Sequence, residues 1–173
     1  WSSDVCSSDL LDACLVTLME HGFTPSSLIA RMAFDSVPDQ VQVAMAAGLL
    51  SIGGVFVGTM EGCARILQEG VAAGGDLDEY CTRVVREHRG AKKAMPGFGH
   101  PFHKPDDPRP PRLFDVAKEA GIDGPYLQLL HRLSAAVDRE NGRHLTINAT
   151  GAIGALLLEI GIPAEIMRDR KST

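Results

Sequence analysis

Residues 97–109 read Gly97-Phe98-Gly99-His100-Pro101-Phe102-His103-Lys104-Pro105-Asp106-Asp107-Pro108-Arg109. Prolines interrupt both helices and strands, and glycines let the backbone approach a ligand closely. The run therefore predicts an irregular but stiff loop. It carries an imidazole at His100 and a guanidinium at Arg109, and a guanidinium can bind a carboxylate through two hydrogen bonds. The pattern indicates a site for small anions.

Outside this loop, apolar residues recur at helical spacing, and almost no segment alternates as a half-buried strand would. Glycines such as Gly22, Gly90, Gly121 and Gly161 supply helix ends. The spacing predicts helices over residues 11–19, 25–32, 39–50, 59–67, 76–90, 111–120, 126–140 and 148–160. We therefore expect an all-α fold.

Three further segments carry recognisable motifs. They are Glu20-His21-Gly22-Phe23-Thr24-Pro25-Ser26-Ser27, Gly48-Leu49-Leu50-Ser51-Ile52-Gly53-Gly54-Val55-Phe56-Val57-Gly58 and Leu145-Thr146-Ile147-Asn148-Ala149-Thr150-Gly151. Together with the Gly-x-Gly-His and Asp-Pro-Arg of the loop, they resemble the citrate synthase superfamily. That superfamily includes citryl-CoA lyases and the carboxy-terminal module of ATP-citrate lyase. The loop and the three other segments occur in the same order as in the family, which makes the resemblance specific. The loop motif alone would be weak evidence.

The resemblance implies a citrate synthase-like fold, with a large helical domain, a small helical domain inserted into it and an active site in the cleft between them. Residues 11–58 and 148–168 would be parts of the large domain, and residues 59–147 would form the small one. On this view the chain is a fragment of a longer protein, truncated at both ends.

Both ends of the chain resemble translated sequencing adapter. Residues 1–10 match one reading frame of a library adapter, and residues 169–173 match the reverse complement of part of it. We expect both segments to be foreign to the natural protein.

The resemblance also implies roles for individual residues. In members of the family the matching positions contact oxaloacetate, acetyl-CoA or the reacting atoms. His100 would hydrogen-bond the ketone oxygen in condensation, and would accept the citryl hydroxyl proton in cleavage. The other implied contacts are His21, Arg109 and Asn148 to substrate, Thr150 in catalysis, and Gly97, Phe98 and Gly99 to CoA; no metal and no cofactor beyond the CoA thioester are expected.

Two positions depart from the synthase pattern. Synthases carry a histidine where this chain has Phe56, and the lyase branch also has phenylalanine there, which favours a lyase. Thr150 stands where the family has a catalytic carboxylate, and a hydroxyl cannot act as a base near neutral pH. Either Glu61 or His144 replaces the carboxylate, or the proton moves through water held by Thr150 and Asn148.

Several of these residues also have a purely structural interpretation. His21 can complement a helix carboxyl end, and Asn148 and Thr150 are natural helix caps. We interpret His103 as a bystander in the loop. For His100 we favour a functional role, because the irregular backbone of its loop costs folding free energy.

Three functions remain open. The chain is a citryl-CoA lyase that forms acetyl-CoA and oxaloacetate, a condensing citrate synthase, or a relative that binds an acyl-CoA or a dicarboxylate without turnover. Phe56 argues against the synthase, and Thr150 keeps the binding protein possible.

Composition narrows the partners and the location. A net charge of -5 without a basic stripe gives no footprint for nucleic acid, and no apolar run is long enough to span a membrane. Outside the adapter-like ends the cysteines are widely spaced, which favours a reducing cytoplasm. The family resemblance implies a homodimer that buries residues 43–50.

Overall fold

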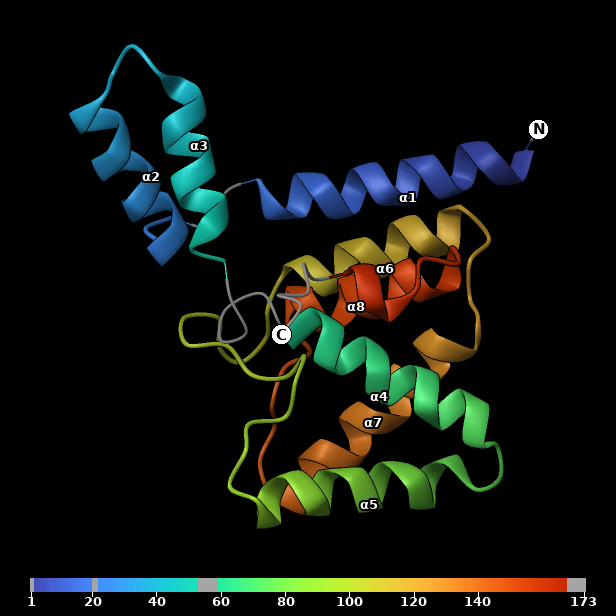
Figure 1. Ribbon diagram of the computed structural model, residues 1–173. Helices are drawn as coiled ribbons and strands as arrows, with labels where there is room; N and C mark the ends of the chain where they lie inside the picture. Colours follow the sequence, from blue (N-terminus) through green and yellow to red (C-terminus); the bar gives the residue numbers. More distant parts are fainter. Residues whose placement is uncertain (1, 20–21, 53–58, 168–173) are drawn as a thin grey trace. The chain divides into compact units, whose positions relative to one another are not determined.

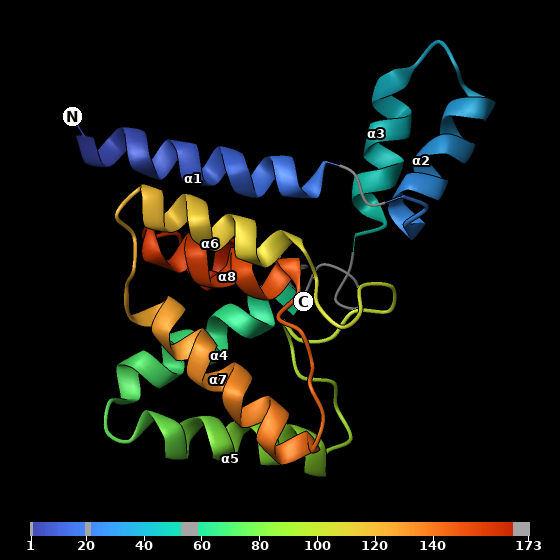
Figure 2. The same ribbon diagram turned by 180° about the vertical axis from the view of Figure 1, so that it is seen from behind.

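The computed structural model describes residues 2–19, 22–52 and 59–167, and it is helical (Figures 1 and 2). Within these ranges the only extended pairing is an isolated antiparallel bridge between Phe98 and Ile147. The all-α prediction is confirmed. None of the described helices is both long and apolar enough to cross a membrane.

The elements are α1 (Ser2–Leu18), α2 (Pro25–Ser36), α3 (Val41–Leu50), α4 (Thr59–Ala73), α5 (Leu77–Gly90), α6 (Arg109–Glu119), α7 (Pro125–Asn141), α8 (Ala149–Glu159) and the 3-10 turn η1 (Ala164–Ile166).

Helix α8 lies at the centre of the larger of two compact units, which comprises residues 1–17 and 59–173. Its residues from Gly151 to Leu158 are all buried, as expected of a helix that is apolar on every side. It packs against α4, α6 and α7. Gly154 permits the approach of α4, because a Cβ there would lie 3.0 Å from the Met60 carbonyl oxygen.

Helix α1 adds Leu10 and Cys14 to this core, and both are buried. The helix begins at Ser2, so it includes described residues that the sequence predicts to be adapter-derived. The expected foreign origin of residues 1–10 and 169–173 stays a prediction, as does the division into large and small domains.

The helix starts follow the expected chemistry at three places. The side chains of Thr24, Asp76 and Asn148 accept hydrogen bonds from the first backbone N–H groups of α2, α5 and α8. Helix α6 was expected from residue 111 but begins at Arg109. The Asp107 carboxylate accepts the Arg109 backbone N–H, and prolines lacking an N–H are tolerated in a first helical turn.

The second unit, residues 18–58, is a pair of helices. Helices α2 and α3 pack closely, because a Cβ on Gly48 would lie only 3.2 Å from the Ala30 Cβ. No residue of α2 is buried within the unit. Large apolar side chains are instead exposed, among them Leu28, Ile29, Met32, Phe34, Val41, Met45, Leu49 and Leu50.

Candidate active site

The loop between α5 and α6 is fastened to the segment that leads into α8. The Gly99 N–H donates to the Thr146 carbonyl oxygen at 2.8 Å, and the Asn148 N–H donates to the Gly97 carbonyl oxygen at 3.0 Å. The Asn148 side chain adds a bond from Nδ2 to the Gly99 carbonyl oxygen. Residues 47 to 51 positions apart in sequence are thereby held together.

Two glycines make this contact possible. Gly97 has a φ of +83°, and a Cβ on it would lie 2.8 Å from the Cys63 Sγ and 2.9 Å from the Gly151 Cα. A Cβ on Gly151 would lie 2.5 Å from the Gly97 carbonyl oxygen. Any larger residue at either position would push the loop away from the N-terminus of α8.

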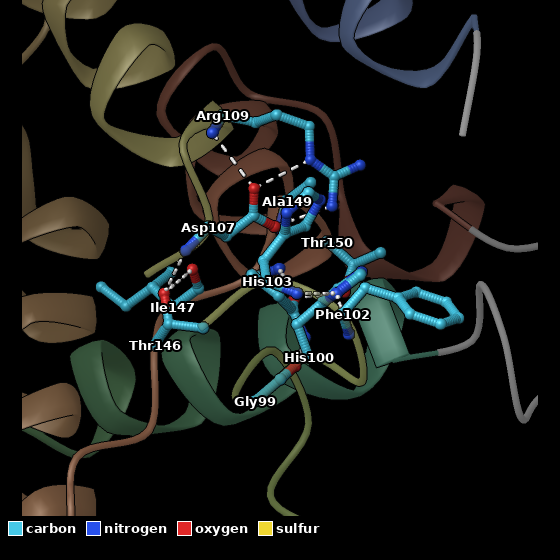
Figure 3. A network of polar contacts seen from close by, with 12 residues as sticks. Gly99, His100, Phe102, His103, Asp107, Arg109, Thr146, Ile147, Ala149 and Thr150 are labelled. Atoms are coloured by element: carbon cyan, nitrogen blue, oxygen red, sulfur yellow. Dashed lines mark hydrogen bonds and ion pairs between the residues drawn. The ribbon is translucent and has the colours of Figure 1, made fainter. Parts of the chain in front are cut away.

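His100 is held in one tautomer by the backbone that follows it. The N–H groups of Phe102 and His103 donate to its Nδ1 at 3.1 and 3.0 Å (Figure 3). Nδ1 is therefore an acceptor, and in the neutral ring the proton lies on Nε2. His100 can thus donate a hydrogen bond to a ketone or alkoxide oxygen. The expected second role, in which the neutral ring accepts a hydroxyl proton, does not fit this geometry.

His103 lies directly beside His100. The ring centroids are 4.4 Å apart with an interplanar angle of 33°. One ring nitrogen from each histidine and one carboxylate oxygen of Asp107 all lie within 4.8 Å of one another. Both imidazoles are half-buried, so each has some access to solvent. The bystander interpretation of His103 is wrong on position, because its side chain belongs to the central cluster of the site (Figure 3).

Asp107 positions Arg109. Asp107 Oδ1 accepts from Arg109 Nε at 2.9 Å and Oδ2 accepts from Nη2 at 2.7 Å, while the Arg109 backbone N–H donates to Oδ1. The Asp107 side chain is fully buried, and that of Arg109 is 21% exposed. Nη1 and the second Nη2 hydrogen face away from this pairing and remain suited to a carboxylate ligand.

The Asp107 carboxyl group is also tied to α8. Its Oδ2 accepts the Ala149 N–H at 3.2 Å, and the Asp107 N–H donates to Thr146 Oγ1 at 2.9 Å. Burial by itself raises the pKa of Asp107, but the hydrogen bonds and charge of Arg109 outweigh burial and hold that pKa below its ordinary value. Asp107 is therefore a stable carboxylate and a poor base.

The Thr150 hydroxyl is part of a chain of side-chain hydrogen bonds. It donates to Asn148 Oδ1 at 2.7 Å, so the 2.9 Å contact with Thr59 Oγ1 must have Thr59 as the donor. Asn148 Oδ1 also accepts the Gly151 N–H and so caps α8. The capping interpretation is confirmed for Asn148, whereas Thr150 lies in the first turn of α8 and its hydroxyl bonds the side chains of Asn148 and Thr59. These bonds join the N-termini of α4 and α8.

Neither expected substitute for the missing carboxylate is well placed. Glu61 is buried and binds Arg65, its neighbour one turn along α4, at 2.8 Å. His144 contacts Asp138 Oδ2 at 2.6 Å and Asp106 Oδ1 at 2.9 Å, so both ring nitrogens face carboxylates. His144 fastens the outer side of the loop, and its hydrogen bonds to both aspartates raise its pKa.

The remaining expected site residues fall into two groups. His21 and Phe56 lie outside the described residues. Gly97, Phe98 and Gly99 lie in the loop, but the Phe98 side chain is buried in the core, so its visible role is to anchor the loop. Their expected contact with CoA stays a prediction.

Sequence reasoning gave no role to His103, Asp107 or Thr146. His103 had a signal, because an imidazole three residues after His100 can fold back on it through a tight turn. Asp107 belongs to the Asp-Pro-Arg motif, and an acidic residue two positions before a helix-starting Arg109 is a capping signal.

His100, His103 and Asp107 are also the donor types that bind divalent metals, within the described part of the chain. However, both Asp107 oxygens already accept hydrogen bonds from Arg109, and His100 Nδ1 accepts two backbone N–H groups. A bound cation would also lie next to the Arg109 guanidinium. The cluster therefore suits an oxygen-rich anionic ligand better than a metal.

Comparison with known proteins identifies the relatives of this arrangement. The family model for citrate synthase, C-terminal domain, matches residues 3–168. The solved structure of a citryl-CoA lyase from Hydrogenobacter thermophilus is similar with a TM-score of 0.82 and 31% identity, over 93% of this chain and 61% of that one. This chain thus spans about three fifths of the length of that lyase.

Two larger proteins match over a smaller share of their length. A probable ATP-citrate synthase of Dictyostelium discoideum is 25% identical over 156 residues, which are 89% of this chain and 24% of that protein. An ATP citrate lyase from Methanothrix soehngenii, solved with citrate and coenzyme A, has a TM-score of 0.75 at 22% identity, over 88% of this chain and 24% of that one. The latter likeness shows the fold alone. From the match over residues 3–168, this chain belongs to the citrate synthase family.

Proposed function

We propose that this protein cleaves citryl-CoA to acetyl-CoA and oxaloacetate, or runs the reverse condensation. The observation that carries the proposal is the joint placement of His100 and Arg109. A His100 nitrogen lies within 4.8 Å of an Asp107 carboxylate oxygen, and Asp107 holds the Arg109 guanidinium at 2.7 Å. A proton donor and a carboxylate-binding fork thus meet within the span of one four-carbon keto acid.

The chemistry needs a donor at the oxygen that changes between hydroxyl and ketone. His100 Nε2–H meets this need, since charge builds on that oxygen as the carbon–carbon bond breaks. Arg109 holds a carboxylate of the same substrate. The similarity to a citryl-CoA lyase and the lyase-like Phe56 favour cleavage over the alternative of a condensing citrate synthase.

The test is a citryl-CoA cleavage assay with the purified protein, following the release of oxaloacetate. Arg109→Lys keeps the charge but removes the fork, so it should lower kcat/KM about 10- to 100-fold, mainly through KM. A matched control is Arg112→Lys on the same helix, whose exposed side chain bonds Glu119. If the unmutated protein does not cleave citryl-CoA, the proposal is wrong.

A second function is binding without turnover, which the Thr150 hydrogen bonds favour. The Thr150 proton is committed to Asn148 Oδ1, so this hydroxyl cannot replace a carboxylate base. Under this alternative, calorimetry detects oxaloacetate binding, the cleavage assay stays at background, and Thr150→Asp creates measurable cleavage.

A homodimer is part of the proposal. Helix α3 has no charged residue, and the exposed apolar side chains of α2 and α3 form a surface typical of an obligate interface. The proposed location is the cytoplasm, which is supported by three buried free thiols, those of Cys14, Cys63 and Cys81.

A further inference from the structure

The proposed cleavage requires a base that the residues considered so far do not supply. The hydroxyl proton of citryl-CoA must leave its oxygen when the ketone forms. His100 Nδ1 accepts two backbone N–H groups and its Nε2 carries the proton, so the neutral ring has no lone pair for that hydroxyl. Thr150 donates to Asn148, and Asp107 is a weak base because Arg109 stabilises its carboxylate.

His103 is another imidazole in the centre of this cluster. Its ring lies 4.4 Å from that of His100, centroid to centroid, and a ring nitrogen lies within 4.8 Å of both a His100 nitrogen and an Asp107 oxygen. A ligand oxygen bound at the His100 ring is therefore close to a second imidazole. Imidazole is the most common general acid–base group in enzymes.

We infer that His103 is the general base of the cleavage reaction, taking the hydroxyl proton of a 3-hydroxy-3-carboxyacyl thioester such as citryl-CoA. This inference rests on the proposed function and names the group that replaces the carboxylate absent at residue 150. In the reverse direction, the neutral ring takes a methyl proton from acetyl-CoA and then donates it to the oxygen that becomes the hydroxyl.

The step balances in protons and electrons. The O–H bond breaks and its proton goes to a His103 ring nitrogen, while the O–H electron pair forms the ketone C=O. The adjacent carbon–carbon bond breaks, and its electron pair forms the enolate of acetyl-CoA. The His103 imidazolium then returns one proton, directly or through water, to the enolate carbon. No oxidant, reductant or metal is consumed.

His103 contributes to the site in two separable ways. Its backbone N–H fixes the His100 tautomer, whereas its side chain takes the proton. His103→Ala and His103→Asn keep the backbone N–H and therefore keep His100 in place. Loss of activity in both variants would thus report on the imidazole and not on the orientation of His100.

The experiment measures citryl-CoA cleavage by the unmutated protein, His103→Ala, His103→Asn and the control His131→Ala. His131 is exposed, its ring contacts that of Phe114, and it is not a member of the cluster. We expect both His103 variants to lose about 10²- to 10⁴-fold in kcat with little change in KM. Added imidazole should partly restore His103→Ala, the low-pH limb of the kcat profile should disappear, and His131→Ala should match the unmutated protein.

Each other outcome overturns the inference in an identifiable way. If His103→Asn keeps its kcat, or if the loss lies in KM with an unchanged pH profile, His103 is not the base. If a chelator abolishes cleavage and a divalent metal restores it, the cluster of His100, His103 and Asp107 is a metal site instead. If the unmutated protein shows no cleavage, the proposed function fails as well. If the unmutated protein cleaves citryl-CoA and the His103 variants keep their kcat, only the inference about His103 fails.

Discussion

Asp107 grips Arg109 through three hydrogen bonds, two to the guanidinium and one to the backbone N–H. Because Asp107 also accepts the Ala149 N–H, a single carboxylate joins the first residues of α6 and α8. The orientation of Arg109 thus depends on the packing of two helices. Buried carboxylates bonded in this way contribute to stability only while they are ionised.

Asp107→Asn should lower the free energy of unfolding by about 2 to 4 kcal/mol, since it leaves the mostly buried Arg109 without its counter-charge. Urea denaturation followed by circular dichroism measures the loss. The lowered pKa of Asp107 sets the sign of the pH effect. Its contribution is present above the unfolded-state pKa and is lost as the pH falls through the lower folded-state pKa. If the difference in unfolding free energy between the variant and the unmutated protein stayed constant into strong acid, the ionised Asp107 would not be its source.

Gly151→Ala should destabilise the protein by at least about 2 to 3 kcal/mol, because its Cβ would lie 2.5 Å from the Gly97 carbonyl oxygen and neither backbone can yield cheaply. Thermal denaturation measures the effect. The matched control is Gly90→Ala in the last turn of α5, where an added Cβ meets nothing within 4 Å. That variant should be neutral or stabilised by up to about 1 kcal/mol. Equal stability of the two variants would disprove the close contact.

Thr150→Val should cost about 1 kcal/mol of stability, because Asn148 and Thr59 each lose a hydrogen-bond partner. Its kcat should change by less than about threefold, because no acid–base group is lost, whereas loss of one costs about 10²- to 10⁴-fold. Cleavage kinetics and urea denaturation on the same sample separate the two effects. A hundredfold fall in kcat would make Thr150 a participant in proton transfer.

His144→Gln should reveal a pH-dependent contribution of the Asp138–His144–Asp106 bridge. The pKa of His144 is raised in the folded protein, so its stabilisation is fully present below the unfolded-state pKa. It is lost as the pH rises through the folded-state pKa. The difference in unfolding free energy between the two proteins should therefore be largest in mild acid and shrink in alkali. The reverse trend would mean that His144 is neutral in this bridge.

Met45→Glu should weaken the proposed homodimer, because it places a charge within the apolar surface of α2 and α3. Analytical ultracentrifugation at micromolar concentration should show more monomer. Gln42→Glu adds the same charge on the same helix at a position that is already polar, and should leave the association unchanged. A monomeric unmutated protein would remove the case for this interface.

Local sequence signals predicted much of the fold. Asn148 caps α8 as expected, and Thr24 and Asp76 cap α2 and α5 in the same way, because capping depends on neighbouring backbone groups. The start of α6 was misplaced, because the cap of Arg109 comes from Asp107 across a proline. The motif residues His100 and Arg109 were identified together, and the structure brings them to one cluster.

Other parts of the site depend on contacts that sequence spacing does not encode. His144 was a candidate base from its place near the turn before α8, yet Asp138 and Asp106 occupy both of its nitrogens. The spacing of His103 three residues after His100 permits a tight turn, but only the structure shows that the His103 N–H returns to the His100 ring. Asp107 looks like a surface acid in sequence, yet it is buried and bonded to the first residues of α6 and α8.

The two backbone hydrogen bonds that orient His100 have an evolutionary consequence. Since the donors are the backbone N–H groups of residues 102 and 103, every amino acid except proline can occupy position 103 and keep its hydrogen bond to His100. A single codon change could therefore replace the side chain at position 103, while the orientation of His100 is inherited intact.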